Sequence, residues 1–303
     1  MAMNPLLKAI LKALSSAGTD VNYRMERILN RILHPSLKLC YEIWDREIIA
    51  DGFSLPIRVF SPEKARSEEI ILFFHGGGWV SGDIESYTSV CTALAKETGR
   101  RVMSVDYRRA PEYPFPQAPE DCYRATRELF LHSSSKEIAE SRIILMGDSA
   151  GGNLAAAVSL MAADRGEFRI RRQILLYPST YSDHSENSPF RSITENGKGF
   201  LLTSKKVQDY QDLYIRDKAD LINPYFAPLL SDHLGAQPKT LLITAEYDPL
   251  RDEGAAYGEK LRRYGNEVSI YQMDGALHGF FTFSPRSVQV KKCYRIIEQF
   301  LGE

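Results

Sequence analysis

The stretch ILMGDSAGGNLAAA, residues 144–157, decides the fold of this 303-residue chain. It opens with a short apolar run that predicts a strand, passes Ser149, and continues into an alanine-rich run that favours a helix. Glycines flank the serine at positions 147 and 151, as in a nucleophile elbow, where side chains at those positions would collide with neighbouring backbone. The alternative is a serine that only caps the helix. The strand-turn-helix context favours the elbow.

Similar apolar runs recur on both sides of this stretch and alternate with helical sequence. Continuous apolar runs are required of strands that are buried on both faces, and strands alternating with helices form a mostly parallel sheet covered by helices. The sequence therefore predicts an α/β fold with an eight-stranded, mostly parallel sheet. The predicted strands span residues 41–49, 53–60, 70–74, 101–106, 143–146, 174–177, 240–244 and 268–272.

Two segments depart from this alternation. Residues 1–40 favour two amphipathic helices, and residues 182–223 contain no buried-strand run but predict one amphipathic helix over about 204–216. An insertion in a sheet protein lies outside the strand ends. We therefore expect both segments to form a cap over a pocket, and residues 41–181 with 224–303 to form the body.

The first N-terminal helix is expected over residues 6–14, LLKAILKAL. Lys8 and Lys12 interrupt this run, which argues against a signal peptide. The second helix has Met25, Ile28, Leu29, Ile32 and Leu33 on one stripe. We expect it to stop near His34, because Pro35 disfavours helical geometry in the residue before it.

Composition excludes several function classes. The chain is 44% hydrophobic and 25% charged with a formal net charge of −1, so no basic balance indicates a nucleic-acid partner. No run is long and apolar enough to span a bilayer. The four cysteines form no C-x-x-C pair, which argues against a zinc ribbon or a redox motif and favours buried thiols. We expect a cytoplasmic protein. The cysteines are Cys40, Cys91, Cys122 and Cys293.

A serine needs a base and an orienting acid to become a nucleophile. His278 stands apart among the six histidines, because it follows the last predicted strand after a short loop, where it can reach Ser149. Asp248 follows the strand before it and is the preferred acid. Glu246 and Asp252 are the rivals, although an acid in the first turn of a helix, as expected for Asp252, is favourable for dipole reasons alone.

Backbone N–H groups for an oxyanion hole are expected from the residue after the serine, Ala150, and from the glycine-rich stretch FFHGGGWVSGD, residues 73–83. Three consecutive glycines after a buried strand are costly in chain entropy, and close approach of backbone amides to a ligand explains them. We expect Gly76 and Gly77 to contribute, with Gly78 as a further candidate. The stretch lacks the patterns of phosphate-binding loops, and His75 has no partner at metal-ligand spacing, so neither a cofactor nor a metal is expected.

Several motifs in this order resemble the hormone-sensitive-lipase-like branch of the α/β-hydrolases, the bacterial family IV esterases. They are HGGGW at 75–79, DYRRAPEYPFP at 106–116, GDSAGG at 147–152, EYDPLRDEG at 246–254 and LHGF at 277–280, with Arg109 where Leu is common in the family. The resemblance runs from about Tyr41 to the C-terminus.

The resemblance implies an α/β-hydrolase fold with a helical cap and a Ser149, His278 and Asp248 triad. It also implies hydrolysis of short-chain acyl esters of small molecules through an acyl-enzyme, without a cofactor. Trp79 and the cap residues Phe200 and Leu201 are expected to wall an apolar pocket, together with Phe190 and Leu202, although packing of cap on body explains these residues equally well.

Other interpretations stay open at this point. An amidase or formamidase uses the same machinery, and substrate assays separate them. A non-catalytic binding protein of this fold is disfavoured because His278 is present. Pairing of two copies through the edge of the last strand would give a homodimer.

Overall fold

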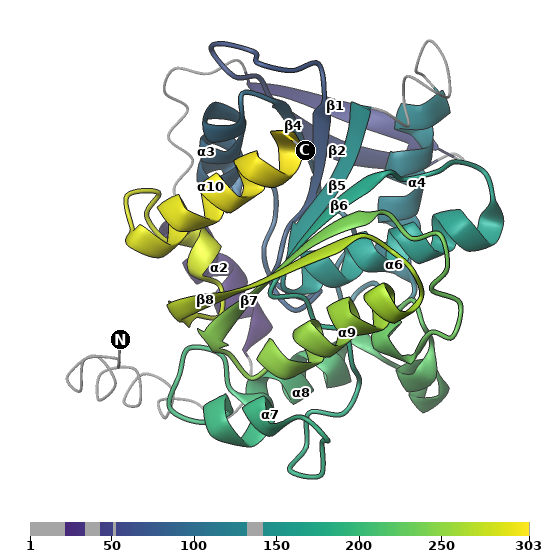
Figure 1. Cartoon of the computed structure of the whole chain (residues 1–303), viewed down its shortest axis with the longest axis vertical. Coiled ribbons are helices and arrows are strands. Elements are labelled where there is room, and N and C mark those ends of the chain that lie inside the picture. Colours follow the sequence, from purple (N-terminus) through teal and green to yellow (C-terminus); the bar gives the residue numbers. More distant parts are fainter. Residues whose placement is uncertain (1–21, 34–42, 51–52, 132–141, 303) are drawn as a thin grey trace.

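The computed structural model describes residues 22–33, 43–50, 53–131 and 142–302. Eight strands in these residues form one central sheet in the order β1-β2-β4-β3-β5-β6-β7-β8 (Figure 1). The pairs β1–β2 and β2–β4 are antiparallel, and every later pair is parallel. The predicted α/β fold and its eight-stranded, mostly parallel sheet are confirmed. The strands are β1 (Ile43–Ala50), β2 (Phe53–Phe60), β3 (Ile70–Phe74), β4 (Arg101–Val105), β5 (Ile143–Asp148), β6 (Arg172–Leu176), β7 (Lys239–Tyr247) and β8 (Val268–Leu277).

The last strand differs most from its prediction, and β7 also runs three residues beyond its predicted end at Thr244. The last strand was expected to end at Gln272 and reach His278 through a short loop, but β8 continues to Leu277. β8 lies at the edge of the sheet, where one side of the strand has no neighbouring strand among the described residues and several side chains are exposed. An edge strand therefore lacks the continuous apolar run by which buried strands are recognised. As a result, His278 follows the strand directly.

Helices cover both faces of the sheet (Figure 1). On one face, α3 (Thr88–Thr98) and α10 (Val288–Gly302) contribute to one apolar core. On the other, α4 (Gln117–Leu131), α6 (Ala150–Arg165) and α9 (Arg251–Arg263) contribute to a second. Because helices bury both faces of the sheet, the central strands β3 to β6 have mainly apolar sequences instead of alternating apolar and polar residues. No helix in the described part of the chain is long and apolar enough to cross a membrane.

The segment between β6 and β7 carries α7 (Arg191–Asn196), α8 (Ser204–Tyr214) and two short 3-10 helices, η1 (Lys218–Ile222) and η2 (Pro228–Leu230). The predicted helix is present as α8, whereas the single turn-and-a-half of α7 was not predicted. A third 3-10 helix, η3 (Phe280–Thr282), follows β8.

The N-terminal helix α2 (Tyr23–Leu33) runs to the last described residue before position 34, so the stop predicted near His34 is not tested. Arg27 of α2 donates to the carbonyls of Val80 and Ala110, and Glu26 accepts a hydrogen bond from Tyr210 of α8 at 2.6 Å. Tyr23 packs against the apolar core of the body. Met25, Ile28 and Leu29 of the predicted apolar stripe are exposed. The helix predicted at 6–14 and the residues His34 and Cys40 lie outside the described residues.

Candidate active site

Ser149 lies at the sharp turn between β5 and α6, with φ 54° and ψ −119°. This backbone conformation is strained for a residue with a side chain and typical of a nucleophile elbow. The flanking glycines are required sterically: a Cβ at Gly147 would lie 2.2 Å from the carbonyl oxygen of Gly151, and one at Gly151 would lie 1.9 Å from that of Phe74. The Ser149 hydroxyl makes no capping bond to α6. It is therefore free to act elsewhere.

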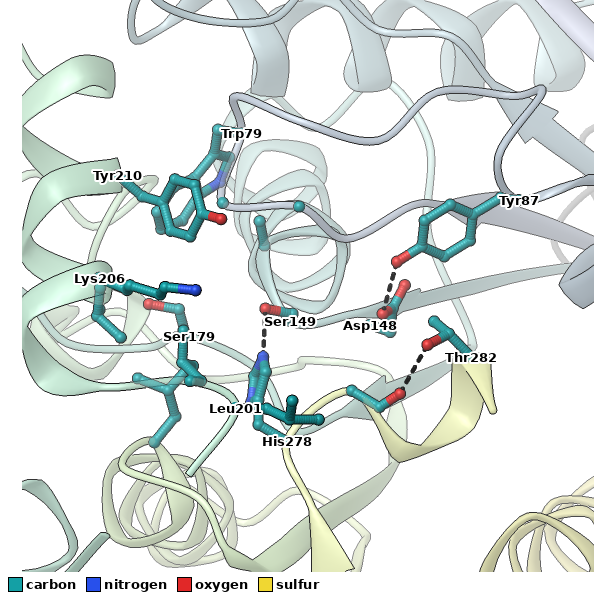
Figure 2. Close-up of a pocket in the computed structure, with 17 residues that line it drawn as sticks. Trp79, Tyr87, Asp148, Ser149, Ser179, Leu201, Lys206, Tyr210, His278 and Thr282 are labelled. Atoms are coloured by element: carbon teal, nitrogen blue, oxygen red, sulfur yellow. Dashed lines mark hydrogen bonds between the residues drawn. The ribbon is translucent and has the colours of Figure 1, made fainter. Parts of the chain in front are cut away.

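The structure brings Ser149, His278 and Asp248 into one hydrogen-bonded line. Figure 2 shows its first step, from Ser149 to His278. His278 Nε2 lies 2.9 Å from Ser149 Oγ, and His278 Nδ1 lies 2.7 Å from Asp248 Oδ2. Asp248 is fully buried and its other oxygen accepts the backbone N–H of Leu250 at 2.8 Å. Because a carboxylate only accepts hydrogen bonds, the imidazole proton sits on Nδ1, which leaves Nε2 as the acceptor for the serine proton.

The two rival acids have other partners. Glu246 accepts the backbone N–H of Gly275 at 2.5 Å and so braces the edge strand β8. Asp252, in the first turn of α9, pairs with Arg251 and accepts the backbone N–H of Ser192 at 2.8 Å. Neither carboxylate reaches His278. Of the three candidates, the geometry places only Asp248 in the line.

The oxyanion-hole prediction is wrong for Gly76. Its N–H already donates to Asp148 Oδ1 at 2.9 Å, and Gly76 is not among the residues that line the cavity above Ser149. The N–H groups of Gly77 and Gly78 have no hydrogen-bond partner among the described residues, and both glycines line the cavity above Ser149, as does Ala150. Ala150 is the first residue of α6, where backbone N–H groups lack intrahelical partners.

Asp148 is a site residue that sequence reasoning missed. Its buried carboxylate binds the N–H of Gly76 and the hydroxyls of Tyr87 at 3.0 Å and Tyr177 at 3.4 Å. Burial raises the pKa of Asp148 to about 6, against the opposing effect of these hydrogen bonds. Asp148 thus ties the glycine loop to the serine turn. Its place inside GDSAGG was the one signal available in the sequence.

His75 is a structural residue. It is fully buried, stacks on Tyr107 with ring centroids 4.3 Å apart, and has Nδ1 2.8 Å from the carbonyl oxygen of Gly76. Burial, with a contribution from the charge of Arg109, lowers the pKa of His75 to about 4, so this ring is neutral. Arg109 itself donates to the carbonyl of Gly82, which braces the same loop from outside and gives this unusual residue a role.

A cavity of about 210 Å³ opens above Ser149 and His278. Trp79 and Leu201 line it as predicted, and so does Leu202. Phe200 does not: its ring stacks on Tyr247 at 5.4 Å and packs against Leu277, so the prediction that it walls the pocket is wrong. Within the described ranges, no group of three or more His, Cys, Asp or Glu side chains is arranged to hold a metal ion.

Residues 71–282 match a family described as alpha/beta hydrolase fold. An arylesterase from Saccharolobus solfataricus is 38% identical over 247 residues, which cover 81% of this chain and 79% of the relative. An ethyl acetate hydrolase from Pseudomonas putida is 35% identical over 234 residues, covering 76% of this chain and 72% of the relative.

Solved structures agree with these relatives. A hyperthermophilic esterase from Pyrobaculum calidifontis has a TM-score of 0.87 and 32% identity, and the match covers 99% of this chain and 97% of that one. By sequence and by fold, the chain belongs to the hormone-sensitive-lipase-like branch of the α/β-hydrolases, the bacterial family IV carboxylesterases.

Proposed function

We propose that the chain is a serine carboxylesterase that hydrolyses short-chain acyl esters, acetyl esters among them, through a Ser149-His278-Asp248 triad and an acyl-enzyme. The observation that carries the proposal is the hydrogen-bonded line of these three side chains, 2.9 Å and 2.7 Å long in its two steps, beneath a cavity at the carboxyl end of the sheet. This is the arrangement that activates a serine hydroxyl.

The reaction follows from the geometry. His278 Nε2 takes the Ser149 proton as Oγ bonds to the ester carbonyl carbon, and the N–H groups of Gly77, Gly78 and Ala150 hold the resulting oxyanion. The carbon–oxygen bond to the alcohol then breaks, and His278 returns the proton to the leaving alcohol. Water hydrolyses the acyl-enzyme by the same route, and Asp248 stabilises the imidazolium in both halves.

The size of the cavity supports small substrates. Pockets for drug-sized ligands occupy about 300–1,000 Å³, whereas this one holds about 210 Å³. Trp79 closes one wall and is fixed by its stack on Tyr214 at 4.7 Å and by a hydrogen bond from its indole to Asn153. The ethyl acetate hydrolase among the relatives supports an acetyl-sized acyl group.

We also propose that residues 1–40 and 182–223 form the cap of this pocket. Leu201, Lys206 and Tyr210 of the second segment line the cavity, and α2 of the first segment contacts Tyr210 and the loop after the glycines.

The edge of β8 is our candidate surface for a homodimer, which a sedimentation measurement of the molecular mass would test. The three described cysteines are buried free thiols, which supports a cytoplasmic location.

The proposal is tested with para-nitrophenyl esters from acetate to decanoate, using the wild type beside Ser149→Ala. We expect hydrolysis that is fastest with the short acyl chains and falls roughly 10⁶-fold in the variant, as removal of a triad serine does elsewhere. Mass spectrometry of the acid-quenched reaction should find one acyl group on the Ser149 peptide. A folded wild type that is inert on every ester contradicts the proposal, and amides and formamides are then assayed.

A further inference from the structure

Lys206 of α8 is the feature of the cavity that hydrolysis of a neutral ester does not explain. The side chain is partly buried and lines the cavity together with Ser149 and His278. Figure 2 shows its ammonium pointing away from α8 into the pocket, on the side of Ser149 opposite Asp148. In the part of the chain that the structure describes, this ammonium has no ion pair or hydrogen bond.

The carboxylates around the cavity already have partners. Asp148 is the acidic residue in the cavity wall, and it binds Gly76 and two tyrosine hydroxyls. Asp209, one turn further along α8, pairs with Lys205, and Glu26 accepts the Tyr210 hydroxyl. Asp209 binds Lys205 through Oδ1, while its Oδ2 is buried without a hydrogen-bond partner. Among the described residues no ion pair joins Asp209 or Glu26 to Lys206, which faces the substrate space.

A cation in this position carries a cost. Its neighbours in the cavity wall include Leu201, Leu202 and Val207, and an ammonium among apolar side chains loses part of its hydration. An anionic group on the substrate would offset that loss through a charge-assisted hydrogen bond. Helix geometry fixes the direction of the side chain, because Lys206 and Tyr210 are four residues apart and both face the cavity.

We propose that the preferred substrate is an ester that carries a carboxylate, which Lys206 binds while Ser149 attacks the ester carbonyl. This inference rests on the proposed esterase function and specifies its substrate class. The carboxylate belongs either to the acyl half, as in a half-ester of a dicarboxylic acid, or to the alcohol half, as in the acyl ester of a hydroxy acid.

The experiment compares each anionic ester with its neutral amide analogue. The acyl arm uses mono-para-nitrophenyl glutarate against the ester whose free carboxylate is replaced by a carboxamide. The alcohol arm uses meta-acetoxybenzoate against meta-acetoxybenzamide. The readout in each arm is the anionic preference, the ratio of the two kcat/KM values. It is measured for the wild type, Lys206→Met, Lys206→Gln, Lys206→Glu and the control Lys205→Met, a neighbouring lysine that pairs with Asp209 outside this cavity.

We expect a wild-type preference well above one in one of the two arms, which identifies the half that carries the charge. In that arm, Lys206→Met and Lys206→Gln should lower the preference about 10- to 100-fold, the usual worth of a hydrogen bond to a charged group. Lys206→Glu should reverse it, and Lys205→Met should leave it unchanged. Circular dichroism checks that each variant is folded.

A wild type that shows no anionic preference in either arm overturns the inference, and so does a preference that survives in the Lys206 variants. Hydrolysis of para-nitrophenyl acetate that is lost in Ser149→Ala separates this failure from failure of the proposed function. If the wild type hydrolyses no ester at all, both proposals fall together.

Discussion

Replacement of Asp248 by asparagine tests the proposed triad at its least exposed member. In the native site, one carboxylate oxygen faces His278 Nδ1 at 2.7 Å and the other accepts the N–H of Leu250 at 2.8 Å. The N–H of Leu250 can only donate, so it fixes the orientation of an asparagine amide, with the oxygen toward Leu250 and the NH₂ group toward His278. A donor then faces Nδ1.

The consequence is the wrong imidazole tautomer. His278 accepts at Nδ1 and carries its proton on Nε2, where it cannot receive the proton of Ser149. The same substitution in the serine-protease triad lowers kcat about 10⁴-fold. We therefore expect kcat of Asp248→Asn with para-nitrophenyl acetate to fall by about 10³- to 10⁴-fold, an increase of about 4 to 5.5 kcal/mol in activation free energy.

The assay includes Glu246→Gln and Asp252→Asn as matched controls, because each replaces a nearby carboxylate that does not reach His278. Both should keep kcat within about tenfold of the wild type, since their contacts are to β8 and to α7 and Arg251. If Asp248→Asn is folded and retains kcat within tenfold while a control loses 100-fold or more, the assignment of Asp248 as the orienting acid is refuted.

Three further predictions concern the glycine loop and the pocket. A Cβ at Gly76 would lie 2.7 Å from Asp148 Oδ2, so Gly76→Ala should displace the loop and lower kcat about 100-fold. The control Gly235→Ala places its Cβ in open space and should leave kcat unchanged. Equal kcat values for the two variants would contradict this role of the loop. Burial raises the Asp148 pKa from 3.8 to about 6, so the stability that its protonation contributes is present below pH 3.8 and is lost as pH rises through 6. Urea unfolding measures this as the free energy of unfolding of the wild type minus that of Asp148→Asn. The difference should fall by about 3 kcal/mol between pH 3.5 and pH 7, and a difference that stays constant would exclude this linkage. Leu201→Trp should fill the cavity and lower kcat/KM for the butanoate ester about tenfold more than kcat/KM for the acetate ester. Phe200 lies outside the cavity, so Phe200→Leu should leave the ratio of these two kcat/KM values unchanged. The opposite pattern would reverse the assignment of the two side chains.

The sequence by itself determined the features that depend on residues close together along the chain. The strand, glycine-flanked serine and helix around Ser149 are contiguous, and their steric requirements act over a few residues, so the elbow was predictable. The positions of His278 and Asp248 were also predictable, because parallel strands end at one edge of a sheet and residues that follow them lie close together. A different rule predicted the sheet itself: continuous apolar runs that alternate with helical sequence form a mostly parallel sheet covered by helices.

Contacts across long sequence separations were decided by the tertiary structure. Whether the amide of Gly76 is free depends on Asp148, 72 residues away, and nothing in HGGG distinguishes its first glycine from the other two. Phe200 and Leu201 are adjacent and both apolar, yet one packs on Tyr247 and the other lines the cavity. In the sequence, Lys206 is one polar residue of an amphipathic helix, and only the position of α8 over Ser149 shows that it lines the cavity. Sequence periodicity says which side chains share a face, and only packing says what that face meets.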